Sequence, residues 1–105
     1  MDMERETITA EELDSSGGLY KIYDIRKNPD DDQIPGSVAF SGWELEFGGE
    51  PPFSRDENVV LYCGGGNTCL RVAEQLRRQG FRTVALEGGF KGWVEAGLPL
   101  EPRLL

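Results

Sequence analysis

Apolar residues along this chain form short runs that are separated by longer amphipathic or polar stretches. The run at residues 58–62, Asn-Val-Val-Leu-Tyr, is almost continuously apolar, which is typical of a strand in the middle of a parallel sheet. Shorter apolar runs predict further strands at residues 6–8, 19–25, 37–40 and 83–86, and the first of them is expected at a sheet edge. The pattern therefore indicates a series of short strands.

A helical pattern follows the strand at residues 58–62, because apolar residues recur there with the i, i+3, i+4, i+7 spacing of one helix face. The residues on that face are Cys69, Val72, Ala73 and Leu76. Thr9 and Glu12 have the spacing of a capping box, and shorter helices are expected at residues 41–47 and 90–96. Residues 28–33 are polar and acidic, which predicts a loop. Because strands alternate with helices, the fold class is α/β.

The composition narrows the range of functions. With 105 residues, the chain is expected to form one domain that spans residues 1–105. Its net charge of −8 disfavours nucleic acid and anionic membrane as partners, and no apolar run is long enough to span a membrane. Because the sequence has 2 cysteines and no histidine, neither a structural metal site nor a cofactor is expected. The N-terminus lacks the layout of a signal peptide, which predicts a cytoplasmic location.

The most informative stretch, the cysteine loop (residues 63–69), joins the apolar strand to the helix. Cys63 ends the strand, and the residues that follow it are Gly64, Gly65, Gly66, Asn67, Thr68 and Cys69. Ligands of open α/β sheets bind beyond the carboxyl ends of the strands. Glycines let the backbone turn its N–H groups inward, and a helix N-terminus favours negative charge. We therefore predict an anion-binding loop centred on the Cys63 sulfur, with a lowered thiol pKa and room for one added sulfur atom, as in a persulfide.

Further motifs accompany the cysteine loop along nearly the whole chain. They are Ile-Thr-Ala-Glu-Glu-Leu at residues 8–13, Tyr-Asp-Ile-Arg at 23–26, Gln-Ile-Pro-Gly-Ser at 33–37 and Leu-Glu-Gly-Gly-Phe-Lys-Gly-Trp-Val-Glu-Ala-Gly-Leu-Pro-Leu at 86–100. With these motifs the chain resembles a single-domain rhodanese, which is a sulfurtransferase-type domain. The resemblance implies a three-layer fold with a central, largely parallel five-stranded sheet that is flanked by helices.

The resemblance also implies a reaction. Cys63, as the catalytic residue, would take sulfane sulfur from a donor such as thiosulfate, hold it as a persulfide and pass it to cyanide or a thiol. A small redox protein is a further possible partner. The residues implied to bind the substrate and the persulfide are Gly64, Gly65, Gly66, Asn67, Thr68 and Cys69. Supporting roles fall to Asp24, Arg26 and Arg71; for the first two, a solvated loop pair is the alternative.

The chain departs from the family pattern at three positions. Thr68 stands where arginine is common, Gln33 where histidine is common, and Cys69 where serine is common. Without the loop arginine, an anionic donor is expected to bind more weakly, because one cation beside an anion near a protein surface contributes about 4 kcal/mol before desolvation. The cations that could compensate are Arg26, Arg71 and Lys91.

Two other functions remain open. The first is a non-catalytic rhodanese-like module that docks partners or senses oxidants through Cys63 and Cys69; against it, the helical period places Cys69 in the core, facing away from the pocket.

The second is a phosphatase or arsenate reductase on a related fold. Its chemistry needs an arginine at the sixth position after the cysteine, to clamp an oxyanion with two hydrogen bonds. That position is Cys69, which disfavours this function.

Overall fold

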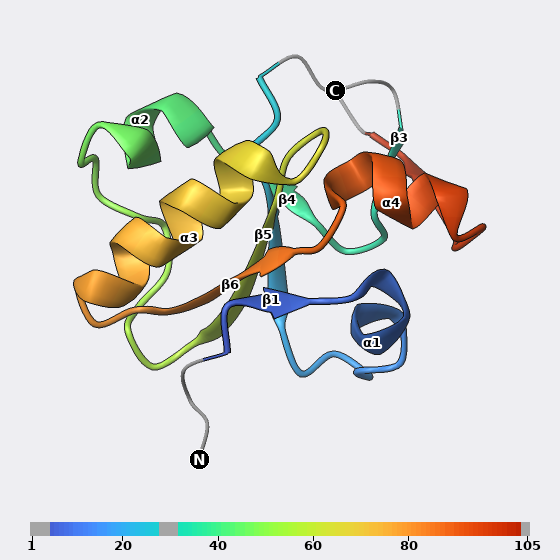
Figure 1. Cartoon of the computed structure of the whole chain (residues 1–105), viewed down its shortest axis with the longest axis horizontal. Coiled ribbons are helices and arrows are strands. Elements are labelled where there is room, and N and C mark those ends of the chain that lie inside the picture. Colours follow the sequence, from blue (N-terminus) through green and yellow to red (C-terminus); the bar gives the residue numbers. More distant parts are fainter. Residues whose placement is uncertain (1–4, 28–31, 104–105) are drawn as a thin grey trace.

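The computed structural model describes residues 5–27 and 32–103, and Figure 1 shows a central sheet with helices on both sides of it. The strands of this sheet are β1 (Thr7–Ile8), β2 (Lys21–Asp24), β4 (Val38–Ala39), β5 (Asn58–Tyr62) and β6 (Arg82–Leu86). Their order is β1-β6-β5-β2-β4, and every neighbouring pair is parallel. The predicted α/β fold with a five-stranded sheet is confirmed, and β5 is its central strand.

Two layers of helices cover the sheet. The helices are α1 (Ala10–Asp14), α2 (Gly42–Glu46), α3 (Asn67–Arg78) and α4 (Gly89–Glu95). On β5, Val59 and Leu61 pack in one buried cluster with residues of α2 and α3, whereas Val60 and Tyr62 pack in a second cluster with residues of α1 and α4. All four side chains are 0% exposed, as expected for a strand that is covered on both faces. The three-layer arrangement is therefore confirmed.

The local helix signals also agree with the structure. The predicted apolar face of α3 is at most 2% exposed at each of its positions, and Gly80 follows the helix with a φ of +96°. Arg78 pairs with Glu74 one helical turn earlier. The capping box of Thr9 and Glu12 is present at the start of α1. In the part of the chain that the structure describes, no helix is long and apolar enough to cross a membrane.

A small second sheet differs from the prediction. β3 (Asp32–Gln33) pairs antiparallel with β7 (Glu101–Pro102), although residues 32 and 33 fall in the stretch expected to be a loop. The rest of that expected loop, residues 28–31, lies outside the described residues. Gln33 accepts a hydrogen bond from Arg103 Nη1 at 3.1 Å, so β3 depends on a partner far along the chain. A strand of two residues that is stabilised in this way has no periodicity of its own, which is why the pattern did not reveal it.

Candidate functional site

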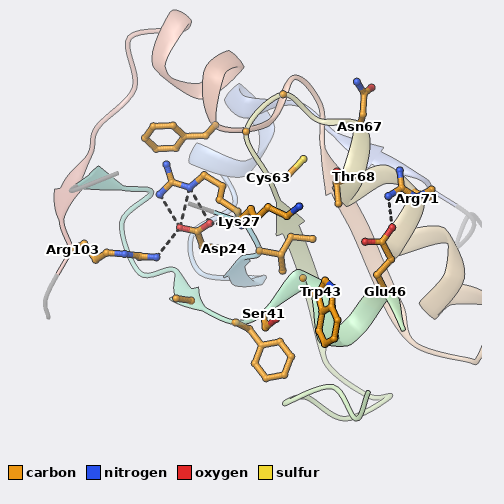
Figure 2. A pocket seen from close by; sticks show the side chains of 18 residues that line it. Asp24, Lys27, Ser41, Trp43, Glu46, Cys63, Asn67, Thr68, Arg71 and Arg103 are labelled. Carbon is orange, nitrogen blue, oxygen red and sulfur yellow. Dashed lines mark hydrogen bonds and ion pairs between the residues drawn. The ribbon is translucent and has the colours of Figure 1, made fainter. Parts of the chain in front are cut away.

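A pocket of about 1090 Å³ opens at the carboxyl edge of the sheet, and Figure 2 shows it from close by. Cys63 follows β5 directly, and its side chain is 6% exposed in the wall of this pocket. Every predicted site residue lines the pocket except Gly66 and Cys69. The chain thus brings its candidate residues together at the edge where parallel sheets bind their ligands.

Backbone N–H groups of the cysteine loop point at the Cys63 sulfur. The N–H groups of Gly66 and Cys69 donate to Sγ, with nitrogen–sulfur distances of 3.2 and 3.3 Å. α3 begins at Asn67, immediately beside this sulfur, and it has no side-chain cap. The positive end of the helix dipole therefore acts on the sulfur together with the two N–H groups, and both favour a negative charge there.

These contacts lower the pKa of the Cys63 thiol to about 5. The hydrogen bond from the Cys69 thiol contributes most, and the backbone N–H groups of Cys69, Gly66 and Thr68 add to it against the opposing effect of burial. An ordinary free thiol has a pKa of about 8.5, so it is mostly protonated at neutral pH. Cys63 is instead a thiolate at neutral pH, although the sequence supplies no histidine to activate it.

We expect the alkylation of Cys63 by iodoacetamide to follow this lowered pKa. The reactive thiolate should persist from neutral pH down to about pH 5 and be lost below it, so the rate should be half-maximal near that pH. Cys69→Ala removes the thiol donor but keeps the backbone N–H, and it should move the midpoint to higher pH. Peptide mass spectrometry of initial rates across the pH range, with circular dichroism as a folding control, measures both midpoints. A parent midpoint near that of a free thiol would contradict this prediction.

Cys69 is buried beside the Cys63 sulfur. Its side chain is 0% exposed on the sheet-facing side of α3, as the helical period predicts. Its Sγ lies 3.5 Å from the carbonyl oxygen of Gly66 and 3.9 Å from that of Leu86. The pKa of the Cys69 thiol is raised by its hydrogen bond to the Cys63 sulfur and by burial. Cys69 therefore keeps its proton at neutral pH and serves as a donor, and neither Cys63 nor Cys69 is in a disulfide.

The start of α4 fixes the shape of the cysteine loop. The N–H of Phe90 donates to the Cys63 carbonyl at 2.7 Å, and the N–H of Lys91 donates to the Gly64 carbonyl at 3.0 Å. A Cβ on Gly89 would lie only 2.6 Å from the Cys63 carbonyl oxygen. With these carbonyls bound to α4, the loop presents N–H groups to the sulfur on its other side. This contact explains why α4 begins with a glycine, Gly89, in a chain with this loop.

The three glycines of the loop have different roles. Only Gly66 among them has a φ in the left-handed region, at +100°, where the chain turns into α3. A Cβ on Gly64 or Gly65 would meet nothing within 4 Å. Side chains at these two positions would therefore meet open space, and the unusual backbone conformation that the sequence suggested for the loop is confined to Gly66.

A buried carboxylate joins the end of β2 to the wall of the pocket. Asp24 is 1% exposed and accepts hydrogen bonds from Arg26 at 2.8 and 3.0 Å and from Arg103 at 3.3 Å. The guanidinium carbon of Arg26 lies 4.0 Å from the centre of the Phe90 ring, on α4. Asp24 and Arg26 therefore form a buried pair between β2 and α4, and the solvated-pair alternative does not describe them.

Two pocket residues, Arg103 and Lys27, have no signal in the sequence pattern. Arg103 lies 79 positions after Asp24, and it follows β7, which pairs with β3. Lys27 lines the pocket, whereas Lys91, which the sequence suggested as a compensating cation, does not. Arg71 lines it as suggested. The position of a single basic residue depends on the fold. No local motif could therefore have placed Arg103 or Lys27 in the pocket.

Two relatives that are similar to this chain are named sulfurtransferases. The chain is 37% identical over 91 residues to a tRNA sulfurtransferase of Desulfurococcus amylolyticus, an alignment that covers 85% of this chain and 18% of that protein. It is 40% identical over 50 residues to the thiosulfate sulfurtransferase GlpE of Glaesserella parasuis, covering 47% of this chain and 46% of that protein. The chain thus spans less than half the length of either relative in these alignments.

A family model described as a rhodanese-like domain matches residues 9–96, which includes every strand of the main sheet except β1. Among solved structures, a rhodanese-related protein from Thermoplasma volcanium superimposes with a TM-score of 0.79 at 27% sequence identity. That superposition covers 91% of this chain and 97% of the other. The likeness therefore extends over the fold as a whole and is not confined to the cysteine loop.

Proposed function

Because the chain belongs to the rhodanese-like domain family, we propose that it is a sulfurtransferase that carries sulfane sulfur on Cys63. The observation that carries this proposal is the Cys63 sulfur itself, which accepts two backbone hydrogen bonds in the wall of an open pocket. A thiolate in that position can act as a nucleophile toward a substrate that binds in the pocket. A relative named for thiosulfate supports thiosulfate as the donor.

The proposed reaction has two halves. In the first, the Cys63 thiolate attacks the outer sulfur of thiosulfate, a Cys63–sulfur bond forms, the sulfur–sulfur bond of the donor breaks, and its electron pair leaves with sulfite. In the second, cyanide attacks the outer sulfur of the persulfide, thiocyanate leaves, and the Cys63 thiolate returns. The pocket that Cys63 lines provides room for the added sulfur. The N–H groups of the loop stabilise its negative charge in both halves.

Intact mass spectrometry tests this proposal. Incubation with thiosulfate is expected to add the mass of one sulfur atom to the protein, because the persulfide is a stable intermediate of the double displacement. Subsequent cyanide should remove that mass and release thiocyanate, and initial rates should give parallel double-reciprocal lines. A protein that gains no sulfur from thiosulfate or from polysulfide would contradict sulfur transfer.

A redox-sensing module is the second candidate, because the backbone N–H of Cys69 donates to the Cys63 sulfur and the two cysteines are therefore neighbours. In that function an oxidant such as peroxide converts Cys63 to a sulfenic acid, which Cys69 attacks to form a disulfide with loss of water. Peptide mapping after mild oxidation, without reductant, separates the two functions. A dominant Cys63–Cys69 crosslinked peptide, in a protein that transfers no sulfur, would favour the sensor.

A further inference from the structure

The pocket is positively charged although the chain as a whole is acidic. The formal net charge of the chain is −8. The charged residues that line the pocket are Asp24, Arg26, Lys27, Glu46, Arg71 and Arg103. Four of them are cations and two are carboxylates, so the pocket is locally cationic. A positive pocket on an acidic protein concentrates anions at that one place.

Two of these cations are committed to the fold. Arg26 and Arg103 both bind Asp24, and their side chains are only 6% and 12% exposed. Their positive charge largely compensates the negative charge of the buried Asp24 carboxylate. The charge that an incoming ligand meets is therefore supplied mainly by Lys27 and Arg71.

Lys27 and Arg71 come from different elements to the same pocket. Lys27 follows Arg26 after the end of β2, and Arg71 lies on α3, just beyond the cysteine loop. Figure 2 shows the Lys27 side chain extending into the pocket and Arg71 lying next to Thr68. Arg71 pairs with Glu46, and its side chain is 59% exposed. An exposed ion pair of this kind is weak and exchanges readily for another anion.

We propose that Lys27 and Arg71 bind the anionic end of the sulfur donor, in place of the cation that Thr68 does not supply, and that Glu46 competes with the donor for Arg71. The identity of the donor rests on the proposed function. Thiosulfate is a dianion that must approach the Cys63 thiolate, so like charges converge and repel one another. The transfer yields a persulfide anion and the sulfite dianion, and the total charge is unchanged. Cations that line the pocket therefore oppose this repulsion during both binding and release.

Calorimetric titration of the Cys63→Ser protein with thiosulfate separates binding from transfer. We expect Lys27→Gln to weaken binding about tenfold, because a charge within the pocket is lost. Lys21→Gln also removes one positive charge, but at the first residue of β2, at the end of this strand that is remote from the pocket. It should change the affinity by less than about twofold. Glu46→Gln should tighten binding about threefold by releasing Arg71. Adding Thr68→Arg to Lys27→Gln should restore the affinity.

Equal affinities of the Lys27→Gln and Lys21→Gln proteins would overturn this inference, since overall charge would then govern binding. Absence of measurable thiosulfate binding to the Cys63→Ser protein would overturn it as well. Neither result touches the proposed function if the parent gains sulfur in the mass experiment. Conversely, the parent protein could fail to gain sulfur while the variants bind thiosulfate as expected. That result would support the anion site and refute sulfur transfer. The difference between the two lysine variants should shrink as the salt concentration rises.

Discussion

Cys63→Ser is expected to reduce sulfur transfer to less than about a thousandth of the parent rate, because a serine hydroxyl is not ionised at neutral pH and forms no persulfide. The substitution exchanges one atom of a side chain. The hydrogen bonds from Phe90 and Lys91 to the cysteine loop come from the backbone, so they remain. The fold should therefore be unchanged by circular dichroism and thermal unfolding. Thiocyanate formation and intact mass after thiosulfate treatment measure the loss.

Cys69→Ser provides the matched control, because serine retains a hydrogen-bond donor next to the Cys63 sulfur. We expect this variant to transfer sulfur within a few-fold of the parent. Cys69 itself is a poor sulfur carrier, since it is 0% exposed and its pKa is raised. Parent-like transfer by Cys63→Ser, or loss of transfer by Cys69→Ser with Cys63 present, would assign the sulfur to Cys69 and refute the proposal.

Gly89→Ala is expected to destabilise the protein by about 3 kcal/mol or more, through backbone strain and steric overlap. Gly89 has a φ of +61°, and its added Cβ would lie 2.6 Å from both the Cys63 carbonyl oxygen and the Gly66 nitrogen. These are backbone atoms, so no side chain can move to relieve the overlap. The cysteine loop must shift, and the pKa of Cys63 should rise because its N–H donors shift too. Urea unfolding measures the first effect and the pH dependence of alkylation the second.

Gly97→Ala separates steric overlap from backbone strain. Gly97 follows α4 with a φ of +73°, but an added Cβ there would meet nothing within 4 Å. It should therefore cost only about 1–2 kcal/mol for the left-handed conformation, with no change in the Cys63 pKa. If Gly89→Ala destabilised the protein no more than Gly97→Ala, the loop would not depend on its contact with α4.

Local patterns predicted the parts of the fold that have strong local causes. The apolar run of β5 requires burial on both faces, and the four apolar positions of α3 fit only a helix against a sheet. These two elements place Cys63 between a strand end and a helix start. Because both the N–H donors and the helix dipole follow from that placement, the anion-binding character of the loop could be predicted from the residues alone.

The rest of the site depends on contacts that no local pattern encodes. Arg103 follows β7, which pairs with β3, and from there it reaches Asp24; Lys27 lines the pocket, whereas Lys91 does not. The resemblance suggested that Asp24 and Arg26 support the loop. Their burial could not be read from sequence spacing, because Phe90, which packs over the Arg26 guanidinium, lies far away along the chain on α4.

The contact between Arg103 and Asp24 has a consequence for how the protein is made. A ribosome delivers the chain from its N-terminus, and domains fold as segments emerge. Most of the sheet can assemble once β6 (Arg82–Leu86) is free, but the pocket lacks one wall until residue 103 has left the ribosome. The Cys63 loop also waits for the backbone of α4. A nascent chain stalled after β6 and before α4 should hold a sheet without a formed thiolate site, so the reactive sulfur matures later than the sheet.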